Sequence, residues 1–191
     1  MIFSEPLIIM LCGLPGTGKT TLAKKIEELY SFSFFSIRDT RRLLNHKTYQ
    51  PEKNYEVFMR IYSDIRASMN KRQSIVFDSN ATSTSRRFEI IEIANLFSYP
   101  VVIIECICLE KEAKKRIVNR FQVKDGLFED SNDPTVHNLL GARWINLSHI
   151  ELSEINVNYV VYDSSKNSVR FAKVKENLKL GLLELFEKTI G

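Results

Sequence analysis

The residues best suited to chemistry lie in one stretch near the N-terminus, Gly13–Thr20, which reads G-L-P-G-T-G-K-T. Its spacing, G-x-x-x-x-G-K-T, is that of a phosphate-binding loop. Glycines allow the backbone to turn its N–H groups inward around phosphate oxygens, at a point where a helix begins. We expect Lys19 to reach the outer phosphates and the Thr20 hydroxyl to ligate Mg²⁺. The stretch therefore predicts a site for a nucleoside triphosphate with Mg²⁺, without indicating which base the nucleotide carries.

The alternative interpretation is a glycine-rich turn with a surface lysine. The flanking sequence argues against it, because an apolar run at residues 7–12 leads into the loop and a helical pattern at 21–29 leads out. This strand–loop–helix order is the context that the motif requires. The residues that we expect to contact the nucleotide here are Gly13, Pro15, Gly16, Thr17, Gly18, Lys19, Thr20 and Thr21.

Two aspartates, Asp39 and Asp78, follow different predicted strands. Near a Mg²⁺–triphosphate, one carboxylate can hold the metal and the other can accept the proton of an attacking hydroxyl. Asp78 ends an apolar strand, which favours the metal side, although it could instead form a turn. Asp39 starts a short predicted helix, so it could be an N-cap, a general base, or both. We predict that Asp39 is catalytic and that Asp78 lies with Thr20 at the metal; which of the two is the base stays open.

Arginines supply the positive charge that phosphoryl transfer needs. Arg42 lies one helical turn after Asp39 on the same face, which suits an acceptor that carries a phosphate or carboxylate. Arg116 and Arg120 are four residues apart and precede a segment, 121–134, whose pattern is broken. We interpret that segment as part of a mobile lid, which would bring Arg120 over the transferring phosphate and Arg116 to the nucleotide.

Each of these arginines could instead belong to a solvated basic face of a helix. We interpret Arg86 and Arg87 in that way, as the start of a helix with a solvated polar face.

The elements that must position these residues alternate between strands and helices. The predicted strands are 7–12, 32–37, 74–78, 100–107 and 157–162. The predicted helices are 21–29, 39–45, 51–70, 85–97, 110–120, 135–149 and 168–188. Such alternation predicts right-handed crossovers, and therefore a three-layer α/β/α fold around a five-stranded parallel sheet. Ligands of such sheets bind beyond the carboxyl ends of the strands. We expect a single domain over 1–191, with a helical lid at about 117–150.

Composition is that of an ordinary soluble protein, with 44% hydrophobic and 26% charged residues in 191. The net charge of +4 fits an anionic ligand without demanding nucleic acid. Cys12, Cys106 and Cys108 lie in or beside predicted buried strands, which indicates reduced, structural thiols in a cytoplasmic protein. The apolar run before the loop has no basic region ahead of it, so we interpret it as a strand and not a signal peptide. No stretch reaches the length of a membrane span.

The ordered set of motifs resembles the polynucleotide-kinase-like P-loop kinases, an AAA-type ATP-binding group that includes the kinase domain of phage polynucleotide kinase and the zeta-toxin-type kinases. The residues that carry the resemblance are Gly13–Thr20, Arg38–Arg42, Val76–Asn80, Arg86-Arg87 and Arg116-x-x-x-Arg120. It covers about residues 7–120.

The resemblance implies a role for each matching residue. The lysine and threonine of the loop match contacts to the triphosphate and Mg²⁺. Asp39 matches the general base, Arg42 a contact to the acceptor's phosphate, and Asp78 a carboxylate that orients this arginine or the metal site. Arg120 matches the lid arginine over the transferring phosphate.

The sequence thus favours a kinase that moves the γ-phosphate of ATP to a hydroxyl. The acceptor could be a nucleic-acid 5′ end, a nucleoside or sugar, or a small metabolite. The alternative is a nucleotide-dependent ATPase or switch protein, in which water is the acceptor and Asp39 is only a cap.

Overall fold

The computed structural model of the chain describes residues 2–46, 51–79, 81, 83–120, 134–145 and 155–191. Its strands form one mixed sheet in the order β2-β3-β1-β4-β5-β6. The strands are β1 Ile8–Cys12, β2 Ser33–Ser36, β3 Ile75–Asp78, β4 Val101–Ile107, β5 Asn158–Asp163 and β6 Ser168–Lys173. The first five run parallel, and β6 pairs antiparallel with β5. Their carboxyl ends therefore meet at one edge.

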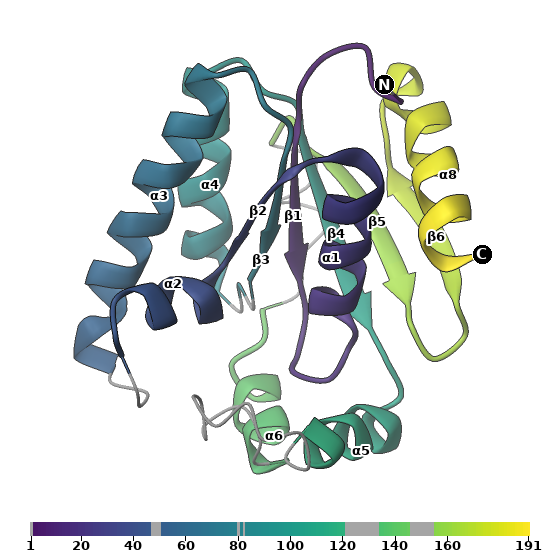
Figure 1. Cartoon of the computed structure of the whole chain (residues 1–191). Coiled ribbons are helices and arrows are strands. Elements are labelled where there is room, and N and C mark those ends of the chain that lie inside the picture. Colours follow the sequence, from purple (N-terminus) through teal and green to yellow (C-terminus); the bar gives the residue numbers. More distant parts are fainter. Residues whose placement is uncertain (1, 47–50, 80, 82, 121–133, 146–154) are drawn as a thin grey trace.

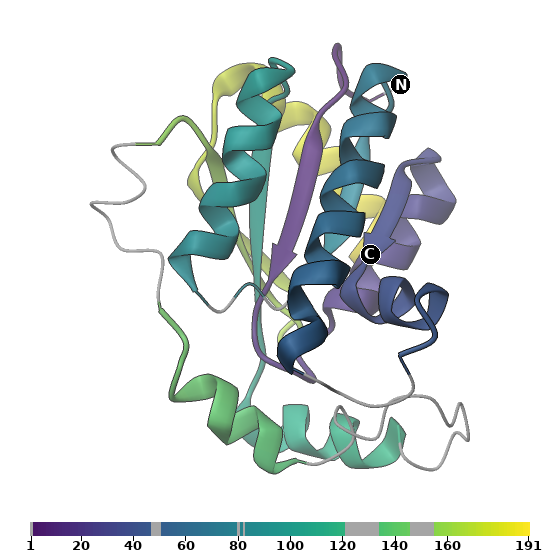
Figure 2. The same ribbon diagram turned by 90° about the vertical axis from the view of Figure 1, so that its left-hand side faces the viewer.

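Helices cover both faces of this sheet (Figure 1). They are α1 Lys19–Tyr30, α2 Ile37–Leu43, the short 3₁₀ helix η1 Pro51–Lys53, α3 Asn54–Asn70, α4 Thr84–Leu96, α5 Glu110–Arg120, α6 Thr135–Gly141 and α8 Glu176–Ile190. The helices α3 and α4 lie on one face, and α1 and α8 on the other, as the turned view in Figure 2 shows. This arrangement confirms the predicted three-layer α/β/α fold.

Successive side chains of the strands point to opposite faces of the sheet and pack into two separate hydrophobic cores. On β1, Ile8, Met10 and Cys12 pack toward α3 and α4, whereas Ile9 and Leu11 pack toward α1 and α8. All five are fully buried. A strand that is covered on both faces is apolar throughout, which is why β1 and β4 have nearly continuous apolar sequences.

The sixth strand corrects the sequence-based prediction of five strands and of a helix over 168–188. Residues 168–173 form β6, and the helix α8 begins only at Glu176. In β6, Val169 and Phe171 are partly buried against the core while their neighbours are exposed. This alternation, which repeats every two residues, is typical of a strand with one covered face. The turn before it contains Asn167 at a φ of 50°.

Other helices also differ from their predicted limits: α1 begins two residues earlier than predicted, the predicted helix 51–70 divides into η1 and α3, and α4 is shifted by one residue. The helix α2 begins at Ile37 rather than Asp39, because Ser36 is its N-cap. The helix α6 ends at Gly141, short of the predicted end at residue 149. The predicted mobile segment at 121–134 lies, except for Pro134, outside the described residues.

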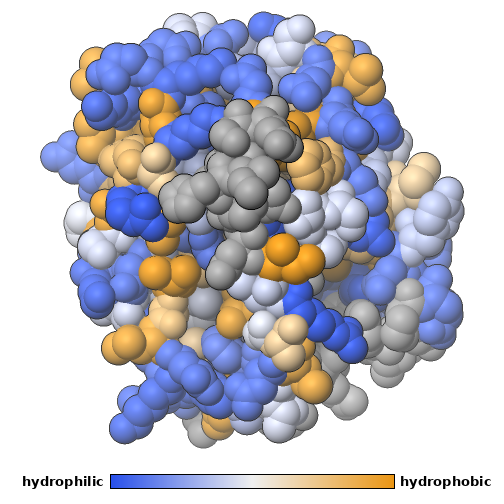
Figure 3. Space-filling view, turned by 180° about the vertical axis from the view of Figure 1, so that it is seen from behind, coloured by the Kyte–Doolittle hydropathy of each residue, from blue (hydrophilic) through white to orange (hydrophobic). Residues whose placement is uncertain are grey.

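On the face opposite that of Figure 1, hydrophobic residues are scattered among hydrophilic ones (Figure 3). Within the described ranges, none of the helices has the length and apolar character needed to cross a bilayer.

Candidate active site

The phosphate-binding loop joins β1 to α1 at the carboxyl edge of the sheet, and α5 and α6 lie beyond that edge (Figure 1). Gly18 precedes the first residue of α1 in a left-handed conformation, with φ of 93°. Gly16 also has a positive φ, of 84°, and a Cβ atom there would lie 2.4 Å from the carbonyl oxygen of Ala113 in α5. The loop therefore needs glycine at both positions for its turn, and at Gly16 also for its close contact with α5.

Three groups of the loop converge on the carbonyl oxygen of Leu14. The Lys19 ammonium donates to it over 2.9 Å, and the Thr17 hydroxyl donates over 2.8 Å. The backbone N–H of Thr17 points to the same oxygen at 3.4 Å. Lys19 is 7% exposed, so its charge lies against the loop rather than in solvent.

Thr20 and Asp78 are joined directly. The Thr20 hydroxyl donates a 2.5 Å hydrogen bond to Asp78 Oδ2. Asp78 ends β3, and β3 lies beside β1, so the sheet itself brings this carboxylate to the start of α1. A hydroxyl and a carboxylate are suitable ligands for Mg²⁺, which usually takes one or two protein groups and completes its shell with phosphate oxygens and water. The pair therefore fits the metal site predicted from the sequence.

Asp39 lies one strand further along the same edge. It is the third residue of α2, and its backbone N–H donates to the hydroxyl of Ser36 over 3.0 Å. That hydroxyl in turn donates to Asp39 Oδ2 over 2.6 Å, so the Ser36 side chain both caps α2 and holds the Asp39 carboxylate. The Asp39 side chain is 45% exposed and accepts a hydrogen bond from Arg42 over 3.3 Å. Since Ser36 lies opposite Asp78 in the sheet, Asp39 belongs to the same region as the metal-side pair.

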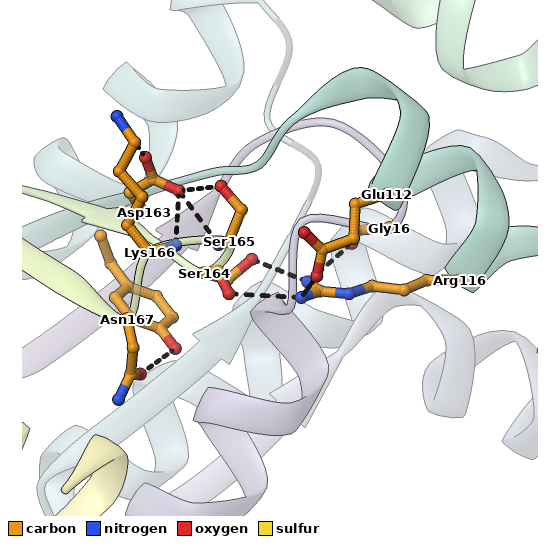
Figure 4. A network of polar contacts seen from close by, with 9 residues as sticks. Gly16, Glu112, Arg116, Asp163, Ser164, Ser165, Lys166 and Asn167 are labelled. Carbon is orange, nitrogen blue, oxygen red and sulfur yellow. Dashed lines mark hydrogen bonds and ion pairs between the residues drawn. The ribbon is translucent and has the colours of Figure 1, made fainter.

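Arg116 points from α5 to the turn between β5 and β6 (Figure 4). Its guanidinium donates over 2.7 Å to the Ser164 hydroxyl and over 3.2 Å to the Ser164 carbonyl. It also donates to the carbonyl of Gly16 over 3.4 Å and pairs with Glu112. Arg116 thus connects the phosphate loop, α5 and the turn.

A cavity of about 410 Å³ opens beside this arginine. Its lining comes from the loop, α1, α5, the β5–β6 turn and the end of α8: Gly16, Gly18, Thr21, Leu22, Lys25, Arg116, Tyr162, Ser164, Asn167, Thr189 and Ile190. Several of these were not predicted from the sequence as site residues. Lys25 donates to the carbonyl of Thr189 over 2.7 Å, and Asn167 donates to that of Ile190. The signal that pointed here was topological, because the turn follows β5 at the ligand edge.

The turn that forms part of this cavity is held by Asp163. Its Oδ1 accepts hydrogen bonds from the backbone N–H and the hydroxyl of Ser165, at 3.0 and 2.5 Å. The hydrogen bond from the Ser165 hydroxyl is the main cause that lowers the pKa of Asp163. The carboxylate therefore stays ionised at neutral pH and orders the turn.

Of the two arginines expected on a solvated helix face, Arg87 contradicts the expectation and Arg86 does not. Arg87 is not on a solvated face: it is 1% exposed, and it donates to the carbonyls of Ala81, at 3.0 Å, and Ile145. Its guanidinium also lies 5.3 Å from the ring centre of Trp144. Arg86 is partly exposed, lies 3.9 Å from the ring centre of Phe58 and pairs with Glu89. The side chain of Arg120 lies outside what the structure describes.

The three cysteines are free thiols, as expected. Cys12 and Cys106 are buried in the sheet, and Cys108 follows β4 and is half-buried. Burial raises the pKa of Cys12 to about 12 and raises that of Cys106 further. Both buried thiols are therefore protonated at neutral pH and are poor nucleophiles. Among the described residues there is no group of three or more acidic, histidine or cysteine side chains that could hold a metal ion.

The parallel sheet, its strand order and the glycine-rich loop between β1 and α1 define the class of the protein, a P-loop NTPase-like fold. A family model described as an AAA domain matches residues 8–132, and the chain belongs to that family. A search of curated proteins finds no relative.

Solved structures with this fold include several proteins described as kinases. A protein from Chloroflexus aurantiacus described as a "putative kinase" superposes with a TM-score of 0.67 at 17% identity, over 95% of this chain and 98% of that one. A structure of the PezAT chromosomal toxin–antitoxin system of Streptococcus pneumoniae gives 0.61 at 12%, over 97% and 86%. A gluconokinase from Sinorhizobium meliloti gives 0.53 at 16%, over 97% and 90%. At these identities the likeness establishes the fold alone.

Proposed function

We propose that the protein is an ATP-dependent phosphotransferase of the P-loop kinase type, which moves the γ-phosphate of ATP to a hydroxyl acceptor. The observation that carries this proposal is the position of Asp39. Its half-exposed carboxylate lies beside Arg42 and is joined through Ser36 to the strand position opposite Asp78. In a kinase, a carboxylate at this place can take the proton of the acceptor hydroxyl. A nucleotide switch has no such acceptor and needs no carboxylate here.

In the proposed reaction the acceptor oxygen attacks the γ-phosphorus, and the bond from that phosphorus to the β,γ-bridging oxygen breaks. The proton of the acceptor hydroxyl goes to the Asp39 carboxylate, and ADP leaves. Lys19 contacts the outer phosphates, and Thr20 and Asp78 are the residues that would hold Mg²⁺. When bound, Mg²⁺ would neutralise charge on the phosphate oxygens.

The remaining roles concern the two ends of the reaction. Arg42 would contact a phosphate or carboxylate of the acceptor, and Arg120 would act from a lid at about 117–150 of a single domain. The cavity beside Arg116 would take the base and ribose of the nucleotide, because it adjoins Gly18 and Thr21 at the start of α1. The free cysteines fit a cytoplasmic protein.

A nucleic-acid 5′-hydroxyl is the first acceptor to test, as expected for the polynucleotide-kinase-like group. Of the basic and aromatic residues near Asp39, Arg41 is 6% exposed and donates to Asn54, so it is not a surface contact. Tyr55 at the start of α3 is 74% exposed and offers a ring on which a base could stack. Nucleosides, sugars and small metabolites are the other acceptor classes.

The experiment is a screen of labelled ATP against oligonucleotides, nucleosides, sugars and metabolites, with the variant Asp39→Asn. Asparagine keeps an oxygen that can accept from Ser36, so α2 stays capped, but it cannot take a proton. We expect transfer to fall about 10²- to 10⁴-fold, the usual contribution of a general base. The matched control is Ser36→Ala, which weakens the cap by about 1 kcal/mol and leaves the carboxylate in place.

The result that would refute the proposal is unchanged transfer in Asp39→Asn, or no transfer to any acceptor class. Fast ATP hydrolysis without an acceptor would instead favour a nucleotide-dependent ATPase or switch. In that case Asp39→Asn would hydrolyse ATP at the wild-type rate, because the residue would serve only the start of α2.

A further inference from the structure

The tip of the phosphate loop is held from outside by side chains of α5 and α6. His137 of α6 contacts the carbonyl oxygen of Pro15 through Nδ1, at 2.9 Å. Arg116 of α5 donates to the next carbonyl, that of Gly16, at a longer 3.4 Å. Two consecutive carbonyls of the loop therefore have side-chain partners on α5 and α6. The contact to Pro15 is the shorter and comes from the helix that the proposed lid contains.

The direction of this hydrogen bond is fixed by its chemistry. A carbonyl oxygen only accepts, so Nδ1 of His137 carries the hydrogen. The side chain is buried, with 6% exposed, and the loop and α6 are also close at Gly141, where a Cβ atom would lie 3.7 Å from Leu14 Cδ1. The imidazole is thus enclosed at the contact between α6 and the loop, where water does not compete freely for the Pro15 carbonyl.

Holding this carbonyl also orients the amide on the other side of the same peptide. The peptide between Pro15 and Gly16 is trans. In a trans peptide the C=O and N–H groups point in opposite directions. When the Pro15 oxygen faces His137, the N–H of Gly16 faces away from α6. A phosphate-binding nest depends on several such N–H groups that point into one concavity.

We propose that His137 is a positioning residue, whose hydrogen bond to Pro15 orients the phosphate-binding loop and so couples α6 to phosphate affinity. This inference rests on the proposed function in one respect, that the loop binds a triphosphate. It differs from a simple packing role, because it requires a hydrogen-bond donor at the place of Nδ1 and not merely a side chain that fills the space.

Two substitutions of His137 distinguish the loss of the hydrogen-bond donor from the loss of side-chain volume. In His137→Asn the amide nitrogen can take the place of Nδ1, while His137→Leu fills similar space without a donor. Leu139, on the same helix and 62% exposed, gives the control Leu139→Ala. The experiment is calorimetric titration of the full chain with Mg²⁺ and a non-hydrolysable ATP analogue, and separately with inorganic tripolyphosphate, which reports on the phosphate site alone. Thermal unfolding of each variant verifies that it is folded.

We expect His137→Leu to bind both ligands about fivefold or more weakly, which corresponds to the loss of one net hydrogen bond. His137→Asn and Leu139→Ala should bind within about twofold of the wild type, a smaller change than that loss. Wild-type affinity in a folded His137→Leu would overturn the positioning role, and so would an Asn variant as weak as the Leu variant. If the wild-type protein bound neither ligand, the proposed function itself would fall, and this inference with it.

Discussion

The hydroxyl of Thr20 and the carboxylate of Asp78 are 58 positions apart in sequence and are joined by a 2.5 Å hydrogen bond. Their contact follows from the strand order, because β3 lies next to β1 and Leu11 is opposite Asp78. The first turn of α1 and the end of β3 therefore meet at the edge where ligands bind. The two side chains satisfy each other's hydrogen-bonding capacity, and together they would supply the two oxygens for the proposed Mg²⁺.

Changing Asp78 to asparagine should raise the Mg²⁺ concentration that transfer requires, and it should affect the affinity for nucleotide less. The amide can still accept from Thr20, but it carries no negative charge for the cation. We expect transfer at saturating ATP to fall about 10- to 100-fold, as is usual when a residue that supports a metal is changed. The measurement is the rate of transfer as a function of Mg²⁺ concentration, with the Mg²⁺ requirement shifted upward.

Thr20→Ser is the matched control for this prediction, because it keeps the hydroxyl that contacts Asp78. It should retain a Mg²⁺ dependence close to that of the wild type. If Asp78→Asn had an unaltered Mg²⁺ dependence, Asp78 would be a turn residue and not part of the metal site.

Gly16→Ala should destabilise the protein and disturb the phosphate site together. A Cβ at this position would lie 2.4 Å from the carbonyl oxygen of Ala113, and φ is 84°, so both space and backbone oppose alanine. We expect a loss of about 1–3 kcal/mol in the free energy of unfolding, the range for a residue held in an unfavourable conformation. Urea denaturation measures it.

Gly141→Ala provides the comparison within the same region. Gly141 is the last residue of α6. A Cβ atom on it would meet only Leu14 Cδ1, at 3.7 Å, which is an ordinary van der Waals contact. Alanine should therefore leave stability unchanged or raise it by about 0.4–1 kcal/mol, through lower entropy of the unfolded chain. Equal losses from the two substitutions would contradict the role assigned to the loop's contact with α5.

Much of the fold was predictable because its signals are local. The phosphate loop has a fixed spacing, and β1, β3, β4 and β5 are short apolar runs between polar segments. The limits of α5, Glu110–Arg120, agree with the sequence-based prediction. Each of these depends on neighbours within a few residues, so no knowledge of the tertiary structure was needed.

The features that escaped prediction depend on distant partners. The strand β6 has only two inward side chains, Val169 and Phe171, so its sequence does not distinguish it from the amphipathic helix that follows. The sequence allows Asp39 to be the N-cap of α2, but the hydroxyl of Ser36, one turn earlier, has that role. The position of His137 against Pro15 has no signal in the sequence, since 122 residues separate them.

Arg87 shows the same limit for charged residues. A helical arginine next to a second arginine is usually solvated, and only the fold reveals that this one is buried.

Arg87→Leu should lower the free energy of unfolding by about 2–3 kcal/mol, because the carbonyls of Ala81 and Ile145 would lose a donor. The measurement is urea denaturation. The control is Arg60→Leu, which removes a largely exposed ion pair with Asp64 and should cost no more than about 1 kcal/mol. Equal effects of the two changes would contradict the buried role.

The buried thiol of Cys12 should make stability depend on alkaline pH. Burial raises its pKa in the folded protein to about 12, from an ordinary value of 9.0. Between these values the unfolded chain loses the thiol proton while the folded chain keeps it, so the unfolded state binds fewer protons. Stability is therefore unaffected by this group below about pH 9 and falls as pH rises toward 12, by up to about 1.4 kcal/mol per pH unit.

The test compares urea denaturation of the wild type and Cys12→Ala from pH 8 to pH 11. Other groups with raised pKa values, such as Tyr62 and Tyr99, add slopes of the same sign in both proteins and cancel in the difference between the two curves. Besides burial, the charge of Cys12 is one cause of the raised pKa values of Cys106 and Tyr159, so the difference reports Cys12 together with its effect on these two groups. The alanine variant should be less stable at pH 8, because it leaves a small cavity, but should lose stability less steeply above pH 9. Parallel curves for the two proteins would show that the Cys12 thiol titrates normally in the folded state.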